Sequence, residues 1–129
     1  MDDQAEIRHL MARYAHCADD RDARGRAALF AVDAHYFAGA NELVGPAAIE
    51  AEIAARAASQ PPERKTKHLL GNSAIDIHGD EAEVFTDYVL LIRTNDSSPW
   101  ETRGTGRYHD RFVKRDGRWF YAQNKTLAQ

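Results

Sequence analysis

The sequence predicts an α+β fold, a cone-shaped barrel in which three N-terminal helices pack on a strongly curved antiparallel sheet. Three observations lead to this prediction. Apolar residues at helical spacing are concentrated in the first half of the chain, long β segments joined by short turns fill the second half, and glycines interrupt those β segments. A chain of 129 residues has the usual length of one domain, so we expect a single domain over residues 1–129.

The first helix is predicted from Asp3 to about Asp20. Apolar side chains recur there at helical spacing, and an acidic residue at the start can cap the helix and suits its positive end. A short second helix is expected from about Asp22 to Ala31, with Leu29 and Phe30 facing inward.

A short hairpin and a third helix follow. The strands His35–Phe37 and Glu42–Val44 are joined through Gly39–Asn41. Gly45 and Pro46 start the third helix, because proline is suited to the first helical turn.

Four long strands complete the predicted fold: Lys67–His78, Glu81–Thr94, Glu101–Lys114 and Arg118–Thr126. Short turns at Gly79-Asp80 and Arg115–Gly117 predict an antiparallel meander, and Gly71, Gly104 and Gly106 indicate bulges or sharp bends within it. The strand from Glu81 is apolar on both faces. We therefore expect a second copy of the chain to cover the outer face, in a homodimer or higher homo-oligomer formed through the sheet.

Charge and composition narrow the class of partner. The formal net charge of −3 argues against nucleic acid or anionic lipid as the main partner. No apolar run approaches the length of about 18 residues that a membrane span needs. The acidic start Met1–Gln4 lacks the features of a secretory signal. We expect a cytoplasmic protein that binds a small molecule and contacts neither nucleic acid nor a membrane.

Metal and cofactor motifs are missing from the sequence. The six histidines form neither a His-x-His nor a His-Glu-x-x-His pattern, and Cys17 is the single cysteine. Gly104-Thr105-Gly106 lies within a predicted strand and does not open a helix, so it is not a phosphate loop. We expect no metal and no cofactor.

Two residues stand out because of their positions. Asp19 ends a helical stripe that otherwise faces the core, where a carboxylate needs a partner. It either points to water or caps the next helix, or it is held at the rim of a pocket. His68 shares a strand face with Leu70 and Asn72, and it is either a hydrogen-bonded core residue or a catalytic one.

Further polar groups are expected in the same volume. Asp87 lies between Phe85 and Val89 on its strand face, and four tyrosines can contribute hydroxyls: Tyr14, Tyr36, Tyr88 and Tyr108. A histidine, a carboxylate and phenols together suit proton transfer. The alternating arginines Arg103, Arg107 and Arg111 favour a solvated or dimer-rim face over a carboxylate-binding patch.

Three segments carry a resemblance to a known family: Tyr14–Asp22 with Leu29-Phe30, Lys67–Asn72, and Gly106–Asp110 with Arg115–Trp119. In these patterns and in the order of its elements the chain resembles the SnoaL-like group of the nuclear transport factor 2-like superfamily. Scytalone dehydratase and bile-acid 7α-dehydratase belong to this group and use an Asp–His pair with nearby tyrosines. The resemblance implies that Asp19, His68 and Tyr14 are catalytic. One strand departs from the scytalone dehydratase pattern and reads Gly106-Arg107-Tyr108, so scytalone is not the expected substrate.

These observations and the resemblance lead to one hypothesis with two alternatives. We expect a cofactor-independent dehydratase that acts on a small apolar hydroxylated carbonyl or polycyclic compound. His68 would move the proton, Asp19 would orient His68, and Tyr14 would polarise the carbonyl or the leaving oxygen. The expected substrate-binding residues are Asp87, Tyr88, Tyr108, Met11, Phe30, Leu70 and Phe112, with Leu29 and Val89 as further apolar walls. An isomerase or polyketide-type cyclase would use the same pocket, and a non-catalytic binding or accessory subunit would not need the dyad.

Overall fold

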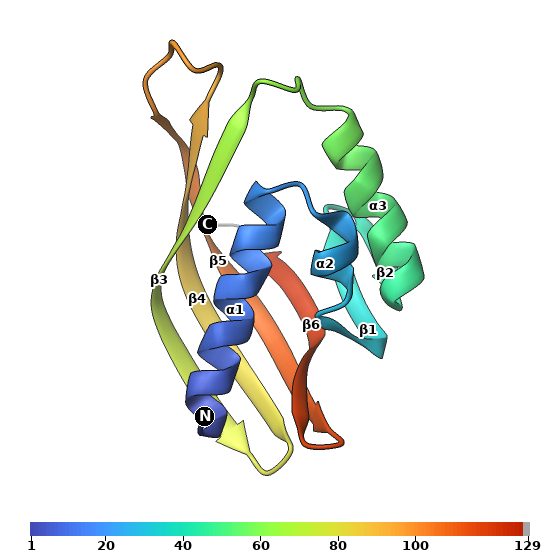
Figure 1. Cartoon of the computed structure of the whole chain (residues 1–129). Coiled ribbons are helices and arrows are strands. Elements are labelled where there is room, and N and C mark those ends of the chain that lie inside the picture. Colours follow the sequence, from blue (N-terminus) through green and yellow to red (C-terminus); the bar gives the residue numbers. More distant parts are fainter. Residues whose placement is uncertain (128–129) are drawn as a thin grey trace.

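The computed structural model describes residues 1–127 and confirms the predicted fold class, with three helices packed on a six-stranded curled sheet (Figure 1). The helices are α1 (Asp3–Asp19), α2 (Ala23–Ala27) and α3 (Pro46–Ala58). The strands are β1 (Phe30–Ala38), β2 (Asn41–Val44), β3 (Lys65–His78), β4 (Glu81–Arg93), β5 (Glu101–Arg115) and β6 (Arg118–Leu127).

Helix α1 lies across the face of the sheet and packs against β3 and β6 (Figure 1). Asp2 caps it by accepting a hydrogen bond of 2.8 Å from the backbone N–H of Ala5. Its buried side includes Ile7, Met11 and Tyr14. Asp19 is the last residue of the helix, so its carboxylate lies beyond this apolar stripe and next to β3.

Helix α2 is shorter than predicted. The expected end at Ala31 is wrong, because Phe30 already begins β1. The backbone N–H of Tyr121 in β6 donates to the carbonyl of Leu29 at 2.9 Å, so the chain already pairs with the sheet at this point. Tertiary pairing outweighs the local helical pattern here.

The sheet has the strand order β2-β1-β6-β5-β4-β3. All neighbours are antiparallel except β1 and β6, which are parallel and close the sheet beyond the predicted meander. The expected irregularities occur next to Gly71, where the β3–β4 register shifts between Leu70 and Ser73, and opposite Leu90 and Leu91, where the β4–β5 register shifts near Gly104. Gly106 remains in regular register with Tyr88 and has a different role, described below.

The apolar core fills the end of the cone near the start of α1. Its fully buried side chains include Ile7, Phe112 and Tyr121. Trp119 closes this end, and its indole N–H donates to Asp3 Oδ1 at 3.0 Å. The polar cavity described below therefore lies at the opposite end of α1, where Tyr14 and Ala18 face it.

The outer face of the sheet carries apolar side chains, as predicted for β4. Leu69 is 50% exposed and lies opposite Val89 on this face. The homodimer expected through this face stays a prediction. Within residues 1–127, no helix combines the length and the apolar character needed to cross a membrane.

Candidate active site

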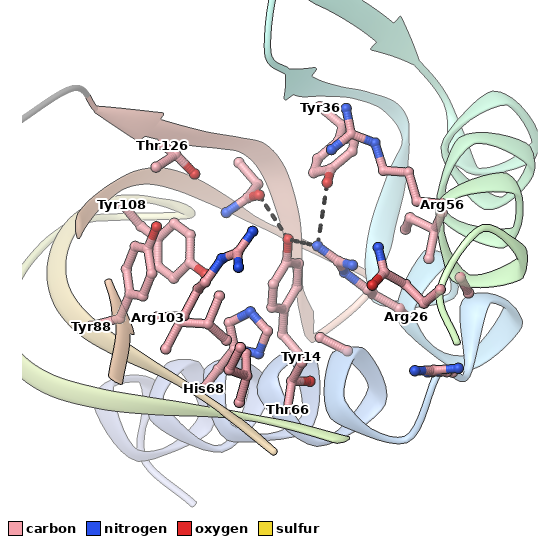
Figure 2. Close-up of a pocket in the computed structure, with 18 of the residues that line it drawn as sticks. Tyr14, Arg26, Tyr36, Arg56, Thr66, His68, Tyr88, Arg103, Tyr108 and Thr126 are labelled. Atoms are coloured by element: carbon pink, nitrogen blue, oxygen red, sulfur yellow. Dashed lines mark hydrogen bonds between the residues drawn. The ribbon is translucent and has the colours of Figure 1, made fainter. Parts of the chain in front are cut away.

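A cavity of about 400 Å³ opens between the C-terminal end of α1, the helix α3 and the inner face of the sheet (Figure 2). Every helix and each of the strands β1, β3, β4, β5 and β6 supplies part of its wall. The polar side chains of the wall include Tyr14, Arg26, Tyr36, Thr66, His68, Tyr88, Arg103, Tyr108 and Asn124.

Asp19 and His68 are in direct contact at the edge of this cavity. Asp19 Oδ1 lies 2.6 Å from His68 Nδ1, which is hydrogen-bond distance. A carboxylate only accepts hydrogen bonds, so Nδ1 carries the hydrogen of this contact and Nε2 is the ring nitrogen that can exchange a proton with a ligand. The structure thus brings together the two residues that the sequence singled out separately.

The rest of the chain holds Asp19 in place. Its carboxylate also accepts hydrogen bonds from Thr66 Oγ1 at 3.0 Å and from the backbone N–H of His68 at 3.0 Å. Burial opposes ionisation of Asp19, but the hydrogen bonds from His68 and Thr66 outweigh it, and the pKa of Asp19 lies below its usual value. The carboxylate is therefore ionised at neutral pH, and the side chains of Asp19 and His68 remain 15% and 21% exposed.

Tyr14 belongs to a buried hydrogen-bonded chain. Its hydroxyl donates to Asn124 Oδ1 at 2.7 Å and accepts from Arg26 Nη2. Asn124 Nδ2 in turn donates to Asp110 Oδ1 at 2.6 Å. Burial raises the pKa of Tyr14, so its hydroxyl keeps the hydrogen, and that hydrogen is directed at Asn124 and not at a ligand.

Asp110 ends this chain inside the protein, where it is 2% exposed. Burial raises the pKa of Asp110 to about 8, against the opposing hydrogen bonds from Asn124 and from the backbone of Lys125. Asp110 is therefore a neutral carboxylic acid at pH 7, and it places no negative charge beneath the cavity.

Tyr88 and Tyr108 form the opposite wall (Figure 2). Their rings stack with centroids 4.3 Å apart and an angle of 14° between the ring planes. A Cβ at Gly106 would lie 2.6 Å from the Tyr88 ring, so glycine is what allows this ring to cross β5. Burial raises the pKa of both tyrosines, and neither hydroxyl makes a hydrogen bond to any other residue of the described chain, 1–127. Both hydroxyls are free to donate to a ligand.

Asp87, expected from the sequence to bind substrate, does not line this cavity. Neighbouring residues of a strand point to opposite faces, and since Tyr88 faces the cavity, Asp87 faces outward. There it pairs with Arg107, directly across on β5, with Asp87 Oδ1 2.5 Å from Arg107 Nε.

The side chains expected to form an apolar cavity wall do not line this cavity either. Met11, Phe30 and Phe112 belong to the buried core, and Leu70 packs against that core. Leu29 also packs there, whereas Val89 lies on the outer face. Helical and strand periodicity show which side of an element is buried, but they do not show how far along the cone a residue lies. The apolar part of the cavity wall comes instead from Ile53, Leu90 and Ile92.

Five arginines line the cavity: Arg21, Arg26, Arg56, Arg64 and Arg103. Sequence reasoning placed Arg103 with Arg107 on a solvated face, but Arg103 is the extra residue of the bulge between the pairs Leu90–Gly104 and Leu91–Thr102. The bulge breaks the alternation, so Arg103 lines the cavity whereas Arg107 lies outside.

Arg26, Thr66 and Asn124 also line the cavity and were not expected from the sequence. A register shift next to Phe112 offsets β6 by one residue, so Asn124 turns inward although strict alternation from Tyr121 would place it outside. For Arg26 the sequence carries no signal, because α2 is one short turn of small residues and arginines. Within residues 1–127, no cluster of three or more His, Cys, Asp or Glu side chains is arranged to hold a metal ion.

Comparison with known proteins places this architecture in a family. The model of the SnoaL-like domain matches residues 1–123. A comparison of the sequence with curated proteins finds no match.

Several solved structures are similar to this chain. An NTF2-like protein with a cystatin-like fold from Novosphingobium aromaticivorans is 26% identical, with a TM-score of 0.79 over 97% of this chain and 80% of that one. A proposed scytalone dehydratase from the same organism is 24% identical, with a TM-score of 0.79 over 97% and 84% of the two chains. A Catenulispora acidiphila protein in complex with S-DNPA is 21% identical, with a TM-score of 0.83 over 95% and 90%. The likenesses below 25% identity concern the fold, whereas the match over residues 1–123 decides membership: this chain belongs to the SnoaL-like domain family.

Proposed function

We propose that this protein is a dehydratase, which removes water from a small hydroxylated carbonyl compound by Asp–His proton transfer. The observation that carries the proposal is the 2.6 Å contact between Asp19 and His68 at the edge of the cavity. The family membership supports it, because the fold is one that a proposed scytalone dehydratase shares.

The proposed reaction has two proton transfers. Nε2 of His68 takes the proton from the carbon next to the carbonyl, and the electron pair of that C–H bond moves into an enolate. The enolate then expels the hydroxyl from the neighbouring carbon, and the imidazolium returns its proton so that the leaving group departs as water. Asp19 stabilises the imidazolium between the two transfers and keeps its ring in one orientation.

Polarisation of the carbonyl falls to Tyr108 and Tyr88 in this proposal. The role first expected of Tyr14 is revised, because its O–H donates to Asn124. The hydroxyls of Tyr108 and Tyr88 are protonated and have no hydrogen-bond partner within residues 1–127, so they can donate to the oxygen that becomes negative. Tyr14 is proposed as a positioning residue that holds Arg26.

The test uses the protein with a panel of hydroxylated cyclic ketones and mass detection of the product. We expect His68→Ala to lower turnover by about 10²–10⁴-fold, the usual contribution of one positioned acid–base group. Asp19→Asn keeps the shape of the dyad but removes its charge, and it should lower turnover without abolishing binding.

The outer face offers a matched control. His109 Nε2 lies 2.8 Å from Glu83 Oε2, which makes a second His–carboxylate pair outside the cavity, and the exposure of His109 is similar to that of His68. His109→Ala should leave turnover unchanged. Equal turnover in the wild type and in His68→Ala would contradict the dyad. Activity that depends on His68 but leaves the substrate mass unchanged would identify an isomerase or cyclase instead.

A further inference from the structure

We propose that the ligand of this cavity carries a carboxylate, which binds to the guanidinium of Arg26 with Arg103 as a second cationic contact. As a statement about the substrate, the inference rests on the proposed function and narrows its substrate class to hydroxylated carbonyl acids. The binding site itself is tested below without turnover.

Arg26 is a cation without a carboxylate partner. Its Nη2 donates to the hydroxyls of Tyr14 and Tyr36, the second at 3.3 Å. Its Nε is enclosed by protein and has no hydrogen-bond partner, and Nη1 makes no hydrogen bond to any residue of the described chain, 1–127. Buried charges in proteins are normally paired, because leaving one unpaired is strongly unfavourable, so an unpaired guanidinium in a cavity wall points to an absent partner.

Several exposed arginines of this chain have carboxylate partners. Arg107 makes two hydrogen bonds to Asp87, and Arg115 makes two to Asp33. These exposed pairs face water, where pairing is least needed. The arginine that most needs a carboxylate is therefore one that lacks it.

The stacking of Arg26 on tyrosine does not replace an anion. Its guanidinium carbon lies 4.4 Å from the Tyr14 ring centroid and 5.6 Å from that of Tyr36. These contacts stabilise the cation and hold its plane, but a ring face supplies no acceptor in line with Nη1. They fix the guanidinium in a position from which it can bind a planar carboxylate.

The surroundings of Arg26 are positive. The cavity wall includes five arginines and no aspartate or glutamate. Asp19 already accepts hydrogen bonds from His68 and Thr66, and burial keeps Asp110 neutral. Arg103 makes no ion pair within residues 1–127, so its charge adds to that of Arg26. A cleft lined by one sign of charge concentrates ligands of the other sign.

The layout indicates how such a ligand would lie. Arg26 and Tyr36 stand at one side of the cavity and Tyr88 and Tyr108 at the other, with Tyr14 between them (Figure 2). A carboxylate at Arg26 would direct the remainder of the molecule towards His68 and the two free tyrosine hydroxyls. Arg26 would thus set the orientation of the substrate in the dehydration proposed above.

The test measures binding by isothermal titration calorimetry with two probes of equal shape, 2-naphthoate and its neutral amide, 2-naphthamide. We expect the wild type to bind the acid at least about tenfold more tightly than the amide, the factor of one charge-assisted hydrogen bond. Arg26→Met should remove this preference, and Arg103→Met should reduce it. Arg107→Met removes an arginine from the outer face and is the control that should retain the full preference.

These measurements distinguish a failure of the carboxylate site at Arg26 from a failure of the Asp19–His68 dyad. His68→Ala should bind 2-naphthoate as the wild type does, so a dyad that proves inactive leaves the carboxylate site standing. A wild type that binds acid and amide equally would overturn the site and leave the dyad untouched. If Arg26→Met does not fold, Arg26→Lys, which keeps the charge and loses the planar fork, takes its place and should lose most of the preference. An unchanged preference in both Arg26→Lys and Arg103→Met would refute the inference.

Discussion

Asp110 makes the stability of this protein depend on pH in a direction opposite to that of most carboxylates. Burial raises its pKa to about 8 in the folded state, whereas an aspartate in an unfolded chain titrates near a pKa of about 4. Between these two values the folded state holds a proton that the unfolded state has lost. Proton release therefore favours unfolding, and the stability contributed by neutral Asp110 falls as pH rises through this window.

The size of the effect on the free energy of unfolding follows from the pH range between the two pKa values of Asp110. For one proton the free energy of unfolding changes by about 1.4 kcal/mol per pH unit, so Asp110 alone should lower it by about 3 kcal/mol between pH 5 and pH 7. Asp110→Asn removes the titration but keeps an oxygen that can accept the hydrogen bond from Asn124 Nδ2. Relative to the wild type, the free energy of unfolding of Asp110→Asn should therefore rise by about 3 kcal/mol between pH 5 and pH 7.

The assay is urea unfolding at pH 5, 6, 7 and 8 for the wild type and for Asp110→Asn. Subtracting the free energy of unfolding of the wild type from that of Asp110→Asn at each pH cancels the titration of every other group. Asp76→Asn, at an exposed position of β3, serves as the control and should give a difference that does not vary with pH. A difference for Asp110→Asn that stays flat from pH 5 to pH 8 would show that Asp110 is ionised in the folded protein, and the reasoning would be refuted.

Three further changes test the packing of the sheet. Gly106→Ala should force the Tyr88 ring off its stacked position and cost about 1–3 kcal/mol, with loss of tyrosine signal in near-ultraviolet circular dichroism; an unaltered signal would show that the ring has room. Phe112→Ala should cost about 3–5 kcal/mol in urea unfolding, because the side chain is 1% exposed, and a loss below about 1 kcal/mol would place it outside the core. If a second copy covers the outer face, sedimentation should detect a dimer that Leu69→Lys dissociates, whereas a monomeric wild type would contradict that expectation.

Local patterns were sufficient for most of the fold. Helix α1 and the long hairpins follow from signals within a few residues of each other, namely the spacing from Ile7 to Ala15 and the turns at Gly79 and Gly117. The end of α2 and the parallel pairing of β1 with β6 depend on distant partners, and short-range patterns contain no information about them.

The site was predictable where a residue violated its local pattern. Asp19 was conspicuous as a carboxylate at the end of an apolar stripe, and the structure places it against His68. Arg103 and Asn124 were missed because bulges in β5 and β6 reset the alternation on which strand reasoning depends. Asp87 was misplaced for a simpler reason, since it and Tyr88 cannot both face inward from one regular strand.

The parallel pairing of β1 with β6 also constrains how the molecule is made. It joins residues of the first third of the chain to the last strand described, and β6 contributes Tyr121 to the core and Asn124 to the cavity. During synthesis, α1 and the hairpin of β1 and β2 leave the ribosome long before their partner exists. The pairing of β1 with β6 and the cavity wall that β6 supplies can therefore form only after β6 has left the ribosome.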